Sequence, residues 1–318
     1  MKKKLLPLSL SILLTLTLSQ KMMAAETQNL HGDDALAATA IVAGASVLIS
    51  GLAVSVLLKS EDTRNLIEKS EIDAVISVSG VPQQAIPTNA ALFHRKLGLP
   101  RTTVAFDINS TCLSFLTGLF CMGNLIAQGV YRHVLLISSD ISSVGLNPKD
   151  AKTASLFGDG AAACVLGAGE VGGIISTYFE TRSENADDCK CEGGGTLLAM
   201  KKDTSIERHY FRMNGPRLFK AAMPSVLKMV QNMTSESKVD LYIPHQASPL
   251  ALDLLQKKLN ISDQQFMNIV RDYGNMIATS IPFALHMAIE EGRLQRGNNT
   301  LLFGTGAGLT IGGVLLEY

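Results

Sequence analysis

The sequence of 318 residues contains no tryptophan, and only 5% of its residues are aromatic. It also carries no net charge, because its 28 basic residues are matched by 28 acidic ones. A neutral chain lacks the bulk positive potential that holds nucleic acid, so no nucleic-acid partner is expected. Hydrophobic residues (47%) and glycine (27 residues) are abundant, and a chain of this length can bury a large core. The composition favours a tightly packed α/β protein.

Cysteine is scarce and irregularly spaced. The five cysteines are Cys112, Cys121, Cys164, Cys189 and Cys191. An odd and scattered set argues against a disulfide framework and favours a reducing compartment, so we expect a cytoplasmic protein. Cys189 and Cys191 have one residue between them and no second pair of ligands nearby, which favours a loop with two incidental thiols over a metal site.

The first 60 residues allow more than one interpretation. Lysines at positions 2–4, an apolar stretch at 5–18 and the small pair Ala24-Ala25 outline a secretory signal peptide, although a strand and a turn of the core fit as well. Residues 35–58 carry no charge and are long enough to cross a bilayer. Because alanine, glycine and serine lower the hydrophobicity of that stretch, we favour a buried helix and leave membrane association open.

From residue 73 onward, short β-branched and apolar runs alternate with apolar residues at helical spacing. The predicted strands are 73–80, 102–108, 133–138 and 161–166. The predicted helices are 89–97 and a segment that begins near residue 112. Strands that alternate with helices at this spacing indicate βαβ units and a largely parallel sheet.

The same order of elements then recurs. Strands are predicted at 240–244, 268–271, 299–303 and 312–318. Helices are predicted at 249–259 and 280–291. The order is kept although few residues are identical, which indicates an internal duplication. We therefore divide the chain into an N-terminal half at 1–170, whose first 60 residues are atypical, and a C-terminal half at 171–318.

One cysteine directly follows a predicted strand. The three residues before Cys112 are Asn109, Ser110 and Thr111, which can accept hydrogen bonds from free backbone amides and are typical of a turn and helix N-cap. We therefore expect Cys112 on the first turn of a buried helix, where the helix dipole favours a thiolate nucleophile. The alternative is that Cys112 is a small buried hydrophobic residue.

Two polar residues follow predicted strands of the second half. His245 comes directly after the strand at 240–244, where a proline stiffens the loop, and could donate a hydrogen bond. Asn275 follows Gly274, which permits a sharp turn, and in the repeat Asn275 takes the place of Cys112. An ordinary packing histidine and an ordinary turn asparagine are the alternatives. Two similar halves that face each other would place Cys112, His245 and Asn275 around one shared pocket.

A glycine-rich stretch follows the strand predicted at 299–303. Residues 304–308 read Gly-Thr-Gly-Ala-Gly and could cradle a phosphate, but no lysine, serine or threonine follows in the arrangement of a P-loop. A backbone amide that closely approaches an oxyanion explains the stretch better.

Five motifs occur in one order between residues 73 and 318. They are Asn109-Ser110-Thr111-Cys112, Phe157-Gly158-Asp159-Gly160-Ala161, His245-Gln246-Ala247, Tyr273-Gly274-Asn275 and the glycine-rich residues 304–313. As a set they resemble the β-ketoacyl-[acyl-carrier-protein] synthase III family of the thiolase superfamily. The resemblance implies an α/β, thiolase-like, duplicated αβαβα five-layered fold and a homodimer. It also implies a decarboxylative Claisen condensation of an acyl thioester with malonyl-acyl carrier protein, in fatty-acid or related biosynthesis, without a metal or redox cofactor.

The resemblance also implies roles for three residues. Cys112 would attack the acyl thioester and carry the acyl group, while the backbone amides of Cys112 and Gly306 hold the oxyanion. His245 and Asn275 would donate hydrogen bonds to the malonyl thioester oxygen as carbon dioxide leaves. The resulting carbanion would then attack the acyl-Cys112 carbonyl.

Positions that bind substrate or carrier follow from the same resemblance. They are Ile86, Lys152, Asn214, Gly215, Lys220, Lys257 and Lys258. Lys220, Lys257 and Lys258 would dock acyl carrier protein, and Ile86 aligns with the residue that a partner subunit inserts into the acyl pocket. The family's clamp for the adenine of coenzyme A needs a tryptophan and an arginine, but this chain has no tryptophan and carries Ala151, beside Lys152, at the second position. We therefore expect a carrier-bound or less usual acyl primer.

Other activities remain as alternatives. One is an acyltransferase, or an enzyme of the same superfamily that condenses two acyl groups head to head. Papain-like cysteine hydrolases share the order cysteine, histidine, asparagine, but a nucleophile after a βα turn in a duplicated chain is unlike theirs. Thiolase is disfavoured because no cysteine follows Cys191, and an inert scaffold subunit is disfavoured because all three polar residues are intact.

Overall fold

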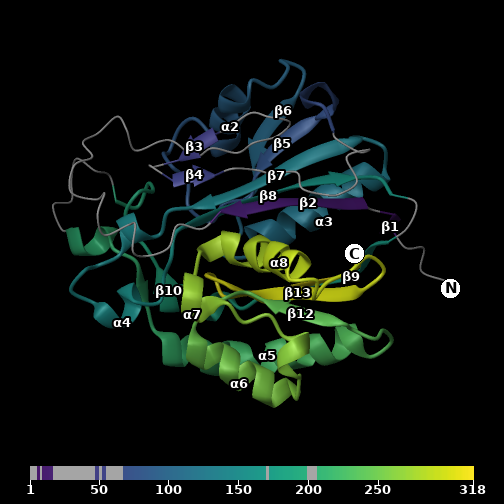
Figure 1. Ribbon diagram of the computed structural model, residues 1–318. Helices are drawn as coiled ribbons and strands as arrows, with labels where there is room; N and C mark the ends of the chain where they lie inside the picture. Colours follow the sequence, from purple (N-terminus) through teal and green to yellow (C-terminus); the bar gives the residue numbers. More distant parts are fainter. Residues whose placement is uncertain are drawn as a thin grey trace.

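Two five-stranded sheets form the body of the molecule (Figure 1). The computed structural model describes residues 6–7, 9–16, 47–49, 52–54, 67–169, 172–198 and 206–318. The first sheet contains, in spatial order, β2 (Ser9–Leu16), β8 (Gly160–Gly167), β7 (His133–Asp140), β5 (Ala74–Ser77) and β6 (Val104–Asp107). The second contains β1 (Leu6–Pro7), β9 (Gly173–Thr181), β14 (Thr310–Glu317), β13 (Asn299–Gly306) and β12 (Leu241–Pro244).

Helices occupy the space between the sheets and both outer faces. Figure 1 shows α2 (Asn89–Leu97) over the first sheet, α3 (Ser114–Ala127) and α8 (Ser280–Glu290) between the sheets, and α5 (Gly215–Thr234) and α6 (Pro249–Leu259) below the second. This αβαβα layering confirms the five-layered fold that the sequence predicts. The bounds of α2 and α6 agree with the predicted helices at both ends.

Shorter elements complete the described part of the chain. They are the helices α4 (Ala151–Ala154) and α7 (Val270–Tyr273), the hairpin of β3 (Val47–Ile49) and β4 (Leu52–Val54), and the pair β10 (Cys189–Lys190) and β11 (Arg212–Met213). Short 3₁₀ helices lie at Lys69–Glu71, Ser143–Gly145, Ser183–Asp188, Ile206–His209, Asp263–Gln265 and Ile277–Thr279.

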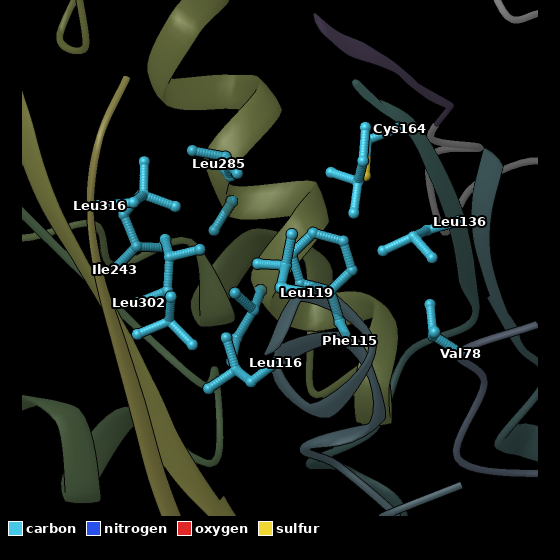
Figure 2. Packing of buried hydrophobic residues seen from close by; sticks show 14 of the residues in the cluster. Val78, Phe115, Leu116, Leu119, Leu136, Cys164, Ile243, Leu285, Leu302 and Leu316 are labelled. Atoms are coloured by element: carbon cyan, nitrogen blue, oxygen red, sulfur yellow. The ribbon is translucent and has the colours of Figure 1, made fainter. Parts of the chain in front are cut away.

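The helix α3 is buried on nearly all sides, which explains why it is so apolar. Figure 2 shows its residues Phe115, Leu116 and Leu119 between the two sheets. In the same cluster, Leu136 comes from β7 of the first sheet and Leu302 from β13 of the second. A helix that is covered on most of its circumference buries apolar residues on most of its faces, and only Phe120 and Ala127 of α3 are exposed. The element that follows Cys112 is therefore fixed by core packing from both halves.

The predicted largely parallel arrangement is wrong. Parallel pairing joins β5 to β6, β5 to β7 and β12 to β13, whereas five other pairs in the two large sheets are antiparallel: β2–β8, β7–β8, β1–β9, β9–β14 and β13–β14. The last two strands of each half follow each other without a long crossover helix, and a parallel pair needs such a crossover. The glycine-rich stretch predicted as a loop is mostly strand, because β13 extends to Gly306.

The N-terminal expectations are corrected where the structure describes those residues. Within residues 35–58, β3 and β4 form an antiparallel hairpin, so a buried helix is wrong there, and the remaining residues lie outside the described part. Within residues 5–18, β1 and β2 agree with the core-strand alternative to a signal peptide. Because β1 pairs with β9, the segment before the division at residue 170 contributes to both sheets. In the described part of the chain, every helix is too short or too polar to cross a bilayer.

The strand predicted at 268–271 is also wrong. Only an isolated bridge between Tyr242 and Phe266 continues the second sheet there, and the chain then enters α7. The buried side chain of Gln246 replaces the strand partner: its amide donates to the carbonyl of Met267, and its oxygen accepts from the amide of Ile269. A side chain therefore satisfies backbone groups that a ladder would otherwise pair.

Candidate active site

Cys112 lies in a tight turn between β6 and α3. The side chain of Asn109 accepts a hydrogen bond from the amide of Thr111 at 2.8 Å, and the hydroxyl of Ser114 donates to the carbonyl of Thr111 at 2.7 Å. Thr111 has a φ of 53°, which is unusual for a β-branched residue. Since α3 begins at Ser114, Cys112 precedes the helix by two residues and does not lie on its first turn as predicted.

His245 directly follows β12 and continues its pairing with β13. Its amide donates to the carbonyl of Phe303 at 2.7 Å, and only 4% of the residue is exposed. Its Nδ1 atom has no hydrogen-bond partner among the described residues. A Cβ atom on Gly304 would collide with the Cβ of His245, so glycine at this position of β13 makes room for the histidine.

The same strand end also carries the turn that contains Cys112. A Cβ atom on Gly306 would lie 2.7 Å from the hydroxyl of Thr111, and this hydroxyl donates to the carbonyl of Ala307 at 3.4 Å. Gly304 and Gly306 are two residues apart on one strand and therefore face the same side. The side chain of His245 and the Cys112 turn thus pack over one face of β13, at one end.

Asn275, also from the second half, is hydrogen-bonded to the loop that carries His245. Its side-chain nitrogen donates to the carbonyl of Ala247 at 3.3 Å, so the asparagine is attached to the loop that carries His245. Its side-chain oxygen accepts from the amide of Ile277 at 2.9 Å, and only 7% of the residue is exposed. The amide of Gly158 donates to its carbonyl at 3.1 Å, which ties the Phe157-Gly158 motif to the same turn.

The turns around Cys112 and Asn275 are structural copies of each other. In both, an asparagine oxygen accepts from the amide two residues on, where φ is positive (53° at Thr111 and 52° at Ile277). The serine five residues after each asparagine, Ser114 or Ser280, accepts a backbone amide in the same way. Asn275 therefore corresponds to Asn109, not to Cys112 as the repeat in the sequence predicts. The position that corresponds to Cys112 is three residues beyond Asn275.

Burial dominates the electrostatics of the two titratable groups. It raises the pKa of the Cys112 thiol to about 12, and the nearby Cys189 and Asp140 add to this shift. The amides of Ala307 and of Cys112 itself donate toward the sulfur and lower the pKa, but by less. Burial also lowers the pKa of His245 to about 4. Desolvation therefore opposes the resting thiolate that the sequence predicts, and it favours a neutral thiol and a neutral imidazole.

Alkylation of the cysteines tests this ionisation state. Because iodoacetamide reacts with thiolate, we expect Cys112 to react at least about 100-fold more slowly than the exposed Cys191 at about pH 8. The rate at Cys112 should keep rising, roughly tenfold per pH unit, up to about pH 10. Peptide-resolved mass spectrometry of timed samples measures both rates. A Cys112 rate that levels off below about pH 9 would contradict the assignment.

The amide that faces the Cys112 sulfur belongs to Ala307, which corrects the predicted Gly306 by one residue. Gly306 is the last residue of β13 and lies opposite Thr310 of β14. Ala307 follows in the turn between the strands, where its amide is free of the ladder. The glycine at 306 instead provides space for Thr111.

The predicted binding residues lie on several different surfaces. Lys220 on α5 and Lys257 and Lys258 on α6 are exposed on neighbouring helices of the outer layer. Lys152 is exposed on α4. Asn214 is the N-cap of α5, where its side chain accepts from the amide of Arg217, and Gly215 is the first residue of that helix. Ile86 is 85% exposed on the loop before α2, so no residue of its own subunit covers it in the described part.

Sequence reasoning missed one buried residue close to the site. Asp140 is fully buried at the end of β7 and accepts hydrogen bonds from segments of both halves. The available signal was an acidic residue two positions beyond the strand predicted at 133–138, because carboxylates are rarely buried without partners. Ala307 was missed for a different reason. Its contribution is a backbone amide, which every residue except proline has, so the residue type does not reveal it.

Comparisons with known proteins identify the family of this chain. Residues 106–183 match the family model described as 3-Oxoacyl-[acyl-carrier-protein (ACP)] synthase III, and residues 229–318 match the model of its C-terminal part. Relatives named Beta-ketoacyl-[acyl-carrier-protein] synthase III, from Syntrophomonas wolfei and Natranaerobius thermophilus, are 32% and 34% identical over 80% and 79% of this chain and 79% of each relative. The crystal structure of 3-oxoacyl-[acyl-carrier-protein] synthase III from Aquifex aeolicus matches with a TM-score of 0.70 and 33% identity, over 79% of this chain and 78% of that chain.

Proposed function

The chain belongs to the 3-oxoacyl-[acyl-carrier-protein] synthase III family, and we propose that Cys112, His245 and Asn275 perform its condensing reaction here. It is a condensing enzyme of the acyltransferase type with a thiolase-like fold. The observation that carries the residue assignment is the meeting of the Cys112 turn and His245 over one face of β13, with Asn275 bonded to the histidine loop.

In the first half-reaction, the sulfur of Cys112 forms a bond to the acyl carbonyl carbon. The thiol is protonated at rest, so it must lose its proton as the bond forms, and the neutral imidazole of His245 is the nearby group able to accept it. The amides of Cys112 and Ala307 hold the developing oxyanion. The bond to the donor thiol then breaks, and the proton leaves with that thiol.

In the second half-reaction, a malonyl thioester replaces the donor thiol. Its thioester oxygen would accept hydrogen bonds from His245 and from the side-chain amide of Asn275. Loss of carbon dioxide leaves its electron pair on the α-carbon, and these two donors stabilise the resulting enolate. A low pKa keeps His245 neutral, so the ring retains one N–H and does not protonate the enolate at the wrong time. The α-carbon then forms a bond to the acyl-Cys112 carbonyl carbon, the bond from that carbon to sulfur breaks, and the Cys112 thiolate takes up a proton from water to restore the thiol.

A condensation assay tests the function. Purified enzyme is incubated with malonyl-acyl carrier protein and a panel of acyl-coenzyme A and acyl-carrier thioesters of different lengths. We expect 3-oxoacyl-carrier product and carbon dioxide in equal amounts, with carrier-bound or unusual primers preferred because the usual coenzyme A clamp is incomplete. Release of free acid without a new carbon–carbon bond would support hydrolysis and sink the proposal.

Acyl carrier protein is the proposed macromolecular partner, held by Lys220, Lys257 and Lys258. These exposed lysines lie on the neighbouring helices α5 and α6, and attraction between opposite charges acts on association more than on chemistry. Reversing the charge at Lys257 and Lys258 with glutamate should raise the KM for malonyl-acyl carrier protein about tenfold while kcat changes less than about twofold. The exposed Arg101, changed to glutamate, is the control. An equal KM increase in the control would show that Lys257 and Lys258 are not specific docking residues for acyl carrier protein.

A homodimer is proposed from two exposed apolar features of the first half. The edge strand β6 of the first sheet presents Val104 at 44% exposure, and Ile86 is 85% exposed. An open sheet edge with apolar residues invites pairing with a second copy. Sedimentation equilibrium at micromolar concentration should give twice the mass of one chain, and a monomer would overturn this part.

The reducing cytoplasm is the proposed site of action. All five cysteines, which lie in the described part of the chain, are free thiols. A nucleophilic thiol also works best where it is not oxidised. Fractionation of cells that express the chain with a C-terminal tag should recover it in the cytoplasmic fraction, and recovery in an exported fraction would argue against this location.

A further inference from the structure

Asp140 is a buried carboxylate to which the proposed chemistry gives no role. It is 0% exposed at the end of β7 and has no basic partner among the described residues. Five donors surround it instead. One oxygen accepts from the amides of Gly80 (2.8 Å) and Val81 (3.0 Å), and the other accepts from the amide and the hydroxyl of Thr279 (both 3.1 Å) and from the hydroxyl of Ser138 (3.4 Å).

The first oxygen of Asp140 connects to the nucleophile. Gly80, whose amide it binds, accepts at its carbonyl from the side chain of Asn109 at 3.1 Å. Asn109 in turn holds the amide of Thr111, the residue directly before Cys112. Gly80 also lies close against this turn, because a Cβ atom there would be 3.1 Å from the carbonyl oxygen of Thr111. Two hydrogen-bonded links therefore join the carboxylate to the Cys112 turn.

The second oxygen of Asp140 connects to the asparagine. Thr279, which gives it two hydrogen bonds, closes the turn that begins at Asn275 by also donating from its amide to Met276. Within this turn the amide of Ile277 holds the side-chain oxygen of Asn275 at 2.9 Å. The two turns are copies of each other, and one carboxylate lies between them.

We propose that Asp140 is a positioning residue that sets the separation of Cys112 and Asn275, holding one turn through each carboxylate oxygen. This inference rests on the proposed function, and Asp140 itself touches no reacting atom. Burying a carboxylate without a counter-ion is costly, and amide and hydroxyl donors offset the cost only when all of them are in place. The arrangement is therefore sensitive to the loss of a single donor, and it links two turns from different halves.

We call the connection from Asp140 through Gly80 and Asn109 the nucleophile arm, and the connection through Thr279 the asparagine arm. Variants of the two arms separate a positioning role of Asp140 from a purely structural one. Asn109→Ala breaks the nucleophile arm, and we expect it to slow acylation of Cys112 roughly tenfold while carbon dioxide release from malonyl thioester stays within about twofold. Thr279→Val removes one donor of the other arm, and the opposite pattern is expected. Thr279→Ser keeps that donor and should restore decarboxylation. Asp140→Asn should slow both half-reactions, each by at least about tenfold.

A readout that does not depend on the enzymatic reaction completes the test. Asp140→Asn removes a negative charge near Cys112, so alkylation of Cys112 should become at least about threefold faster at fixed pH, while Cys164 in the core remains protected. Unchanged Cys112 alkylation in Asp140→Asn overturns the proposal. So does a parallel loss of both half-reactions in Asn109→Ala and Thr279→Val that follows their loss of melting temperature. Failure of the wild type to form acyl-Cys112 would instead sink the proposed function, and the alkylation result would still decide on Asp140.

Discussion

Replacing Cys112 with alanine is expected to abolish condensation, with a fall in kcat/KM of at least about 10³-fold. The side chain supplies the only atom that carries the acyl group between the two half-reactions, and a methyl group cannot form that bond. The change from a thiol to a methyl group leaves the turn intact, since Asn109 and Ser114 hold it through the backbone. The measurement is the rate of 3-oxoacyl product formation from a primer that the wild type accepts.

The same variant separates the two half-reactions. His245 and Asn275 remain in place when Cys112 is alanine, so carbon dioxide release from malonyl thioester should persist without a condensation product. The matched control is Cys191→Ala, which removes an exposed thiol and should keep full activity. Condensation by the Cys112→Ala enzyme at more than about a tenth of the wild-type rate would show that another group carries the acyl chain.

Replacing Asn275 with alanine should have the second largest effect. We expect carbon dioxide release from the malonyl thioester to fall about 10²- to 10³-fold, the usual cost of removing one donor to a developing oxyanion. Formation of acyl-Cys112 should change less than about threefold, because the amides at Cys112 and Ala307 stabilise that step. The variant also loses the hydrogen bond to Ala247, which should lower the free energy of unfolding by about 1 kcal/mol.

Rapid-quench measurements of the two half-reactions provide the comparison. Asn232→Ala, an exposed change on α5, is the control for an asparagine lost away from the site. Equal losses in acylation and decarboxylation would assign Asn275 a purely structural role. An unchanged decarboxylation rate would remove it from the chemistry altogether.

Several elements could be predicted from sequence because local pattern and tertiary packing agree. The helix α6 begins at Pro249 and is preceded by Ser248, whose hydroxyl accepts from the amide of Ala251, so the cap is visible in the sequence. The strand β5 begins with the apolar run Ala74-Val75-Ile76 and is buried at every residue, because both of its faces are covered. The direction of pairing could not be predicted, since it depends on where the connections run and not on residue type.

Some features of the candidate site could likewise be predicted from the sequence, and others could not. Residue types marked Cys112, His245 and Asn275, since thiol, imidazole and carboxamide groups after the ends of predicted strands are uncommon combinations. Contacts between segments far apart in the chain decide three other features. These are the correspondence of Asn275 to Asn109, the amide that Ala307 directs at the sulfur, and the pKa of Cys112. No pattern within one segment carries that information. Two findings weaken the helix-dipole argument for a thiolate: burial raises the pKa of Cys112, and α3 begins only at Ser114.

Mapping of the acyl group is the most direct test of the central claim. Wild-type enzyme is incubated with an isotopically labelled acyl thioester, quenched, digested and analysed by mass spectrometry, with and without a chase of malonyl-acyl carrier protein. The account predicts one labelled acyl group on the peptide that contains Cys112, and its disappearance into 3-oxoacyl product during the chase. A label on a different residue, or an acyl-Cys112 that the malonyl thioester does not discharge, would contradict the account.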